Sequence, residues 1–486
     1  MTYSYDALNL NDGTTYKLTR MTFDSPPRAV TAAALGTRPG GRISAIVDGM
    51  RSLSAGGFIR GATQSATEAN RDTLLTTLGR RRKRLILSGQ DNRFSIASLG
   101  AGGVRVQYIS PTAYAWDAEF VLESPYAYAP TPSGDVRSPT LALLPNQTTQ
   151  YGLRYSLTPG GNVATPLRVL VSNPASGNTP SLVQIANLYN GIERTRAITA
   201  AATLAAPDLL VIDPEREGII TASCTNIVGL WPLEDASGNA LDFSGDARNL
   251  TVNGAPTFRQ DGIIGGCCAF TTTATFFDRA DAALGFTSDF SAGAWVNHDS
   301  LGAAAGIIGK RSASNAGWGV HKTSGDVFAF TVANGASTRT ATGFTTAVAG
   351  QWYRVVVTFT QSSGTLALYV NGRLEAVTAG GAFTPTNAGN NFRVAAVHNT
   401  SGTAEAMVGR IDEPFALDTV LTAAQVATAY EYSLPMALRS ATLALNGFYP
   451  ELDPRIAATN TLLVRADHAS SAPTPLVGIS WRARYG

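Results

Sequence analysis

Apolar and polar residues alternate with a period of two along most of the chain, in short runs that end at Gly, Pro, Asn or Asp. In residues 1–132 such runs include YKLTRMTF, RISAIVDG, KRLILSG and WDAEFVLESP. Alternation of this kind predicts strands that bury one face, and the flanking residues predict turns. The pattern therefore predicts an all-β protein made of many short strands.

One segment of this first block has helical spacing instead. Residues 67–78 carry three leucines that would share one face of a helix. Ser65 followed by Glu68 is the pattern of a capping box, and Gly79 is the residue type that commonly ends a helix in the left-handed conformation. We therefore predict that residues 1–132 form a β-domain with one helix.

A run of five cationic residues, Arg80–Arg84, follows this helix directly. Such a run could bind phosphate groups. It could equally be a solvated or subunit-contacting strand edge, where charge discourages unwanted pairing. The formal net charge of the chain is only +2, and no aromatic residues are interleaved with the cations, which favours the edge over a nucleic-acid site.

A second change of pattern divides the rest of the chain. Strands continue through residues 133–225, whereas residues 226–436 read as a longer, self-contained β-sandwich that closes with a helix starting near Thr422. Residues 437–486 hold about three strands, too few to bury a core alone. We therefore expect 437–486 to complete the sheet of 133–225, with 226–436 inserted between them.

This expectation can be checked at particular positions, because the two parts of the interrupted domain would have to share one core. It places six apolar residues near one another: Leu443, Leu462 and Ile479 against Val169, Val183 and Val211. Coordinates that separate the two groups would contradict the insertion.

Composition narrows the class further. No run of about 18 apolar residues is long enough for a membrane span, and the N-terminal segment lacks the pattern of a secretory signal. We expect a soluble protein made in a cytoplasm, with no membrane partner. The three cysteines are Cys224, Cys267 and Cys268, and their spacing is not that of metal ligands. The vicinal pair is predicted to be two small buried side chains.

Motifs of catalysis are missing from the sequence. There is no H-E-x-x-H or G-x-S-x-G pattern, and Gly309-Lys310 fails as a phosphate loop because Ala304 and Arg311 break the spacing. The histidines are scattered along the chain: His298, His321, His398 and His468. A pair of carboxylates at the separation of about 5–10 Å used by glycosidases stays open, since sequence does not show distances. We expect a protein that is not an enzyme.

Two groups of segments resemble known phage proteins. NDGTTYKLTR, RPGGRIS, NRDTLLTTL and WDAEFVLESPYAYA resemble, in this order, the belt domain of siphophage distal tail proteins. NPASGNTPSLVQIAN, DLLVIDPEREGI and the C-terminal NGFYPELDPRIAATNTLLVRAD resemble the galectin-like β-sandwich that follows the belt in that family.

The middle block resembles a different family, the laminin-G or concanavalin A-like jelly rolls. GLWPLEDASGNALDFSGDARNLTVNGAPTF is similar to the opening of these domains and GIIGGCCAF to their second strand. Trp352–Val355 resembles the tryptophan strand and Leu368–Gly372 the hairpin, while Gly409–Glu413 with LTAAQV resembles the closing segment.

These resemblances imply a specific architecture. The chain would be all-β, with an N-terminal belt β-domain (1–132) with one helix, a discontinuous galectin-like β-sandwich (133–225 and 437–486) and an inserted concanavalin A-like jelly roll (226–436).

The resemblances also imply a function. Six copies would form a ring at the tip of a phage tail, joining the tail tube protein to tail hub or fibre proteins, and DNA would pass through the lumen without specific binding. The protein would be made in the host cytoplasm and reside in the virion, with the inserted domain binding host cell-surface carbohydrate. A free carbohydrate-binding lectin-type module without a virion role is the alternative, and a tail-associated glycan hydrolase is a third reading.

The resemblance to jelly rolls also suggests a metal site. Many domains of this class hold Ca²⁺ near the rim of the sandwich through carboxylate and backbone oxygens. Asp242 and Asp412 fall in the corresponding segments of this chain. The alternative is that both carboxylates cap turns by accepting backbone N–H groups.

For saccharide binding we consider three polar loops rich in Gly and Asn, 310–318, 384–392 and 398–406. Their candidate contact residues are Lys310, Asn315, Trp318, Asn387, Asn391 and His398. Trp318 could stack on a sugar ring, but its G-W-G-V context favours a place in the core. A single shallow site would be weak, and six copies on one ring would raise the effective affinity by about 10²–10⁴ if several engage together.

Overall fold

The chain divides into two compact units, which are described separately in this computed structural model. The first contains residues 1–130, 161–163 and 483–486, and the second contains residues 131–160 and 164–482. The residues that the structure describes are 3–5, 8–23, 28–34, 41–48, 50–79, 83–86, 94–122, 127–138, 142–143, 150–161, 165–172, 182–189, 192–193, 198–200, 208–213, 218–223, 226–312, 315–386, 389–398, 404–431, 439–442, 451–452, 460–467 and 476–485.

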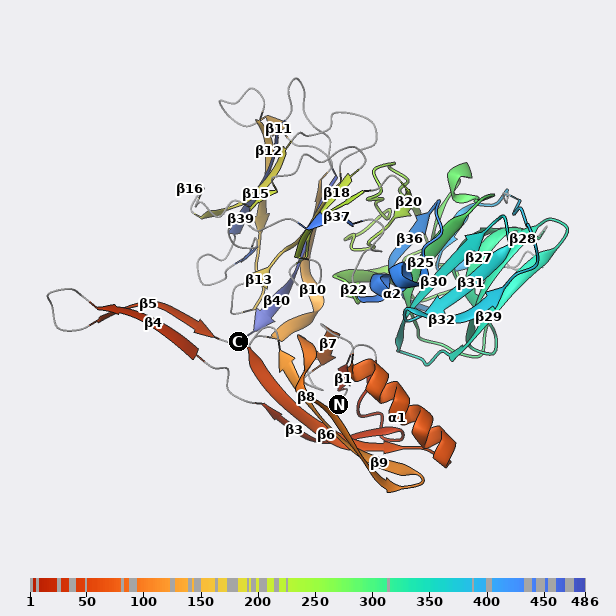
Figure 1. Cartoon of the computed structure of the whole chain (residues 1–486). Coiled ribbons are helices and arrows are strands. Elements are labelled where there is room, and N and C mark those ends of the chain that lie inside the picture. The colour runs from red at the N-terminus through yellow and green to blue at the C-terminus, as the bar shows by residue number, and fades with distance from the viewer. Residues whose placement is uncertain are drawn as a thin grey trace. The chain divides into compact units, whose positions relative to one another are not determined.

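The first unit is an antiparallel sheet with one helix against it (Figure 1). The strand order along this part of the sheet is β3 (Tyr16–Phe23), β6 (Arg51–Arg60), β9 (Ala113–Leu122), β8 (Phe94–Ser110), β7 (Lys83–Ile86), β1 (Ser4–Tyr5) and β2 (Leu8–Asn9). The alternating burial of β9 follows its sequence, with Trp116, Phe120 and Leu122 in the core. At the other side of β8, Tyr128 of β10 (Ala127–Ser138) pairs with Phe94.

Helix α1 (Gln64–Leu78) confirms the predicted helix and its end at Leu78, but it begins before the predicted start. Thr63, rather than Ser65, is the N-cap, because its side chain accepts a hydrogen bond from Ala66 N. Gly79 has φ −68°, so the helix ends without a left-handed residue. Ser65 and Glu68 are two residues out of register for a capping box, since the true cap precedes both.

Strands β4 (Arg28–Ala34) and β5 (Gly41–Asp48) form a two-stranded antiparallel hairpin, drawn as a separate ribbon in Figure 1. Among the strands that the structure describes, these two pair with one another and with no other strand. An isolated hairpin of two strands is marginally stable in water and leaves backbone N–H and C=O groups open on both edges.

The described end of the cationic run is built into the sheet. Lys83 and Arg84 belong to β7, and Lys83 is buried. The guanidinium carbon of Arg84 lies 4.2 Å from the centre of the Phe94 ring. The expectation of a solvated edge is therefore wrong for these two residues, while residues 80–82 lie outside the described part of the chain.

In the second unit, two sheets contain strands from both sides of residues 226–436. One sheet has the order β40 (Leu476–Tyr485), β14 (Arg168–Ser172), β18 (Asp208–Asp213), β19 (Gly218–Ser223) and β37 (Arg439–Thr442). The other has the order β11 (Ala142–Leu143), β12 (Gln150–Leu157), β39 (Asn460–Asp467), β15 (Leu182–Tyr189) and β16 (Ile192–Glu193), and β17 (Ile198–Ala200) also pairs with β15.

The register of these strands confirms that the C-terminal segment pairs with the strands before the middle block. Ile479 is the Cα partner of Val169, and Leu462 is the Cα partner of Asn187. Strand β39 lies between β12 and β15 and pairs with both. Leu443 lies outside the described residues, and the sequence limits assigned to the domains stay a prediction.

Residues 227–431 form a sandwich of two sheets, whose strands are antiparallel except at one parallel pairing, Gly306 with Ala406. One has the order β22 (Thr257–Asp261), β23 (Gly266–Phe270), β36 (Gly409–Leu417), β25 (Phe290–His298), β30 (Trp352–Thr360), β31 (Thr365–Val370) and β32 (Arg373–Thr378), with β20 (Ile227–Leu230) also on β36. The other has the order β21 (Thr251–Asn253), β24 (Phe276–Arg279), β33 (Phe392–Val394), β26 (Ala305–Arg311), β27 (Ala316–Lys322), β28 (Val327–Asn334) and β29 (Thr338–Thr346).

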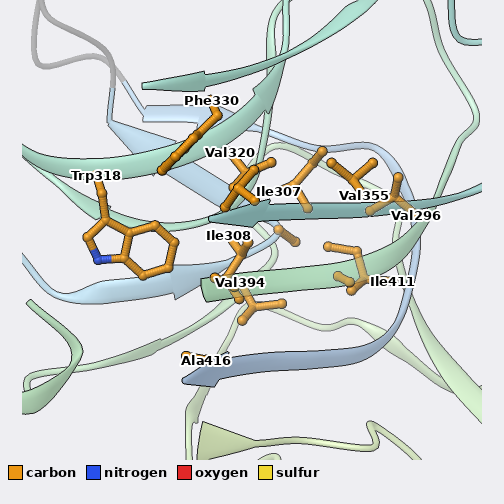
Figure 2. Packing of buried hydrophobic residues seen from close by; sticks show 14 of the residues in the cluster. Val296, Ile307, Ile308, Trp318, Val320, Phe330, Val355, Val394, Ile411 and Ala416 are labelled. Atoms are coloured by element: carbon orange, nitrogen blue, oxygen red, sulfur yellow. The ribbon is translucent and has the colours of Figure 1, made fainter. Parts of the chain in front are cut away.

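A single apolar core fills the space between these sheets (Figure 2). Figure 2 shows Trp318 and Phe330 beside Val320, with Val355 and Val296 further along the same layer. The two sulfhydryl groups of Cys267 and Cys268 are free and buried, as predicted, and Cys224 lies outside the described residues.

The sandwich closes with α2 (Ala423–Glu431), close to its predicted start. Thr422 and Gln425 form a reciprocal cap, in which Gln425 N donates to Thr422 Oγ1 at 3.3 Å and Thr422 N donates to Gln425 Oε1 at 2.8 Å. With α1 and α2 as its α-helices in the described residues, the protein is all-β in class. Neither helix is long and apolar enough to cross a membrane.

Candidate functional site

Arg168, at the start of β14, binds two carboxylates of the 227–431 sandwich at once. Its Nη1 lies 2.5 Å from Glu234 Oε1, and its Nη2 lies 2.9 Å from Glu413 Oε1. All three side chains are buried. A guanidinium presents donors in a rigid fork, so one arginine can satisfy both acids while fixing their positions.

The backbone of β36 bends at these acids. Glu413 has φ +48°, and the register with β25 shifts by skipping from the Gly293–Phe415 pair to the Trp295–Asp412 pair. A β-bulge of this kind redirects the side chains on either side of it. It allows Glu413 to reach Arg168, while Asp412 accepts a hydrogen bond from Ile264 N at 2.8 Å on its Oδ2.

Burial sets the charge of these acids. Desolvation, reinforced by the charge of Glu413, raises the pKa of Asp412 well above its usual value. Desolvation also raises the pKa of Glu413, while attraction to Arg168 opposes the shift. Burial therefore raises the pKa of both neighbouring carboxyls, Asp412 and Glu413. Of the three acids, Glu413 and Glu234 bond directly to the guanidinium of Arg168.

Asp242, the other predicted calcium ligand, is occupied by hydrogen-bond donors. Its Oδ1 accepts from Leu230 N at 3.0 Å and Ser244 N at 2.9 Å, and its Oδ2 accepts from Ser244 Oγ at 2.6 Å and Arg248 N at 2.8 Å. Because donor hydrogens point at both carboxylate oxygens of Asp242, these oxygens are not directed at a cation. The turn-capping alternative describes Asp242.

The donor set around the two aspartates does not fit a calcium site. Ca²⁺ takes six to eight oxygen ligands as a rule, and no group of three or more His, Cys, Asp or Glu side chains within the described ranges is placed to hold a metal ion. Asp412 is fully buried and its environment favours the uncharged acid. The acids also differ from an open glycosidase pair, because Glu234, Glu413 and Asp412 are each at most 3% exposed.

Among the candidate saccharide residues, Trp318 belongs to the core. It is fully buried, and its Nε1 donates to Leu284 O at 3.0 Å. Its ring centre lies 5.1 Å from that of Phe290 and 5.6 Å from that of Phe286. The structure thus supports the core alternative for Trp318, and a sugar-stacking role for it is wrong.

Lys310, Asn315 and Asn391 hold loops together. Lys310 Nζ donates to Asp281 O at 2.5 Å, Thr338 Oγ1 donates to Asn315 Oδ1 at 2.5 Å, and Asn391 Nδ2 donates to Asp278 Oδ2 at 3.0 Å. Each of these three polar side chains therefore makes a hydrogen bond within the domain.

The positions of these candidates along β26 separate them into two groups. Gly309 is the Cα partner of Arg393, so residues 390 and 391 lie toward the Arg311 end of β26. His398 is on β34 (Ala396–His398), whose partner strand β35 (Ala404–Ala406) meets β26 at Gly306, the opposite end. Asn387 lies outside the described residues.

Arg311 lies at the same end of β26 as Asn390 and Asn391, and it was not a predicted binding residue. Lys310 is the cross-strand partner of Trp318, which points into the core, whereas Arg311 is the partner of Gly317. Cross-strand partners share a face and neighbours along a strand alternate, so Arg311 lies on the outer face of the sheet. His321, partner of Gly306, lies on that same outer face by the same alternation from Val320.

A short hairpin, β34–β35, packs on this outer face where the sheet has glycines. A Cβ added to Gly306 would lie 2.2 Å from Val397 N and 2.5 Å from Glu405 O, and one added to Gly319 would lie 2.6 Å from Val397 Cγ1. Any larger residue at these two positions would displace the hairpin. The glycines therefore bring Glu405 against the strand pair that carries Arg311 and His321.

Arg311 is buried, with 6% of its surface exposed. Within the described residues its side chain makes no hydrogen bond or ion pair, and its buried Nε has no acceptor. Burial lowers the pKa of Arg311, while attraction to Glu405 acts in the opposite direction. Burial and the charge of Arg311 lower the pKa of His321 to about 4, so this imidazole is neutral near pH 7.

The sequence contained one usable signal for Arg311. In AGIIGKR, Lys310 is the cross-strand partner of the core residue Trp318. Side chains alternate along a strand, so the next residue, Arg311, lies on the outer face. No local pattern predicts its burial, which appears only in the structure.

Comparison with protein families supports the fold of the inserted block. Residues 271–427 match the model of the concanavalin A-like lectin/glucanases superfamily. This segment of the chain is a concanavalin A-like domain, in agreement with its two-sheet architecture. Among curated proteins, none matches the sequence.

Several solved structures are similar to parts of the chain. The Dit (gp 19.1) protein of phage SPP1, described as a hub adsorption apparatus in phages infecting Gram-positive hosts, is 12% identical over 45% of this chain and 82% of its own, with a TM-score of 0.29. The receptor-binding domain of botulinum neurotoxin type G is 16% identical over 42% of this chain and 51% of its own, with a TM-score of 0.33.

A third similar structure is the ligand-binding domain of botulinum neurotoxin serotype D in complex with N-acetylneuraminic acid. It is 12% identical over 43% of this chain and 51% of its own, with a TM-score of 0.34. The chain spans about half the length of these toxin domains.

Proposed function

We propose that this protein is a ring-forming structural protein of a siphophage tail tip, and that its inserted domain binds saccharide on the host cell surface. The observation that carries the proposal is the pairing of Val169 with Ile479 on opposite sides of a concanavalin A-like domain. A scaffold whose sheet continues across the insertion can display a binding domain without losing its own core.

The order of domains supports the tail-tip part. A β-unit with one helix comes first, an interrupted β-sandwich follows, and a lectin-like domain lies within it. This is the order implied by the resemblance to siphophage distal tail proteins. In that setting the ring would contact the tail tube protein on one side and hub or fibre proteins on the other, without a catalytic step.

The β4–β5 hairpin supports ring formation. Its two strands pair only with one another among the described strands, and a two-stranded ribbon needs further contacts for stability. A second copy of the chain would supply them, and head-to-tail repetition of one such contact closes into a ring.

Ring formation can be tested on the full chain by native mass spectrometry and electron microscopy, with six-fold rings expected. The matched variant replaces residues 24–50 with a short turn. Because Phe23 and Leu53 are Cα partners, a turn can join their strands without stretching the chain. We expect this variant to keep its secondary structure by circular dichroism and to remain monomeric. A full chain that is monomeric at high concentration contradicts the ring.

The saccharide part is tested separately, by binding of the full chain to a panel of cell-wall saccharides. A chain in which residues 226–436 are replaced by a short linker is the control and should not bind. Saccharide binding by a strictly monomeric protein would instead favour the free carbohydrate-binding module.

A further inference from the structure

We propose that Arg311 is the anion-binding residue of a saccharide site on the outer face of the β26–β27 pair, and that its ligand carries a carboxylate or phosphate group. This inference rests on the proposed saccharide binding and narrows it to acidic glycans. It concerns a residue of the candidate loop 310–318 that was not among the predicted contact residues, on the face opposite Trp318.

The first argument is the cost of burying Arg311 without a partner. A guanidinium offers five N–H donors, and buried charges in proteins are as a rule paired and hydrogen-bonded. The other fully or nearly fully buried arginines of the described chain, Arg168 and Arg354, donate to Glu234, Glu413 and the Glu413 carbonyl. Arg311 has no such bond, so an acceptor from outside the chain would complete it.

The second argument is the chemistry of the surroundings. His321 is neutral near pH 7 and can donate or accept a hydrogen bond, as a saccharide hydroxyl requires. Asn390 Nδ2 donates to Arg311 O at 3.2 Å, which fixes the backbone at this end of β26. Glu405 is the carboxylate whose charge acts on Arg311, and it makes no ion pair with it.

The third argument is access. His321, Asn390 and Glu405 are each half-buried, so both ends of the outer face of β26 reach solvent although Arg311 itself is buried. A partly desolvated guanidinium forms stronger bonds to an anion than an exposed one, and its fork matches the two oxygens of a carboxylate or phosphate.

The test measures binding of the full chain to three probes by isothermal titration calorimetry. They are a uronic-acid oligosaccharide, a glycerol phosphate oligomer and a neutral glucose oligosaccharide. We expect one or both acidic probes to bind and the neutral probe to bind at least tenfold more weakly. The two acidic arms distinguish a carboxylate ligand from a phosphate ligand, and either result supports the proposal.

Three variants identify the residue responsible. Arg311→Gln should weaken binding of the acidic probe by about 10- to 100-fold, as expected for loss of charge-assisted hydrogen bonds. Arg311→Lys should retain part of the affinity, because it keeps the charge but loses the fork. Arg373→Gln removes an exposed arginine of β32 and should leave binding unchanged. Circular dichroism checks that each variant is folded.

Two outcomes overturn the inference in distinguishable ways. Equal binding of neutral and acidic probes with no loss in Arg311→Gln refutes the Arg311 site but leaves saccharide binding standing. Failure of all three probes, together with silence on the cell-wall saccharide panel, refutes the saccharide part of the proposed function as well.

Discussion

Arg168 and Arg311 are both buried in the same unit of the protein, and they are held in opposite ways. Arg168 bonds Glu234 and Glu413 through both terminal nitrogens, whereas Arg311 has no bonded partner within the described chain. The first arrangement gives two buried acids a common cation. The guanidinium of Arg311 keeps N–H donors that no described residue accepts from, as expected of a residue that binds a ligand.

The comparison teaches that burial alone does not identify a structural residue. Arg168 joins β14 to the sandwich of residues 227–431, next to a shared apolar cluster that contains Leu170, Val211, Leu230 and Leu417. Arg311 bonds no side chain among the described residues, and an unpaired buried charge lowers stability. Proteins keep such a cost where function requires it.

The largest expected effect comes from removing the paired arginine. Arg168→Met should lower the free energy of unfolding by about 3–5 kcal/mol, because Glu234 and Glu413 lose their common cation. Chemical denaturation monitored by tryptophan fluorescence measures it. Adding Glu234→Gln and Glu413→Gln to this variant should restore part of the loss, and a loss below about 1 kcal/mol would contradict the role assigned to the pair.

A buried, uncharged histidine, His298, makes the stability of the protein depend on pH. Burial, and then the charge of Lys322, lowers the pKa of His298 to about 3. As pH falls below about 6.5 the unfolded chain takes up the proton first, so stability is complete above that pH and is lost progressively toward pH 3.

Replacing this histidine should remove the acid sensitivity that it causes. Between pH 7 and pH 4, where native His298 stays neutral, the wild type should lose about 3 kcal/mol through this residue. His298→Leu should flatten the corresponding part of the stability curve, measured by urea denaturation at each pH. An unchanged slope would contradict a neutral buried His298.

Substitution by methionine, which should lower the stability of the protein at position 168, should raise it at position 311. Arg311→Met replaces an unpaired buried cation with an apolar chain of similar length, and should raise the free energy of unfolding by about 1–2 kcal/mol. Denaturation of both methionine variants under one set of conditions provides the comparison. A loss of stability in Arg311→Met would show that Arg311 is structural.

The smallest effect is expected at Asp412. Since burial favours its uncharged form, Asp412→Asn should change the free energy of unfolding by less than about 1 kcal/mol at pH 7. Glu413→Gln is the matched control and should cost more, because it removes an acceptor of Arg168. Similar losses in both variants would contradict this expectation.

The sequence was informative where the fold depends on local pattern. Alternation predicted the strands, and the shortage of apolar residues after 436 predicted the pairing seen between Val169 and Ile479. Helix limits were less accurate, because Thr63 competes with Ser65 for the cap and only geometry decides between them.

The candidate site was less predictable for a physical reason. Polar loop residues such as Asn315 and Asn391 looked available for saccharide, yet they bond Thr338 and Asp278, which belong to other strands of the same sheet. Arg311 stands in the candidate loop 310–318 but was not among the predicted contact residues, and its burial appears only in the structure. Local sequence carries neither piece of information.

The most direct test of the central claim is a crystal structure of the protein with a bound acidic oligosaccharide. The account predicts a carboxylate or phosphate oxygen about 2.8 Å from a guanidinium nitrogen of Arg311, the distance of a charge-assisted hydrogen bond. An acidic saccharide bound at another surface, with Arg311 paired to Glu405 instead, would contradict it.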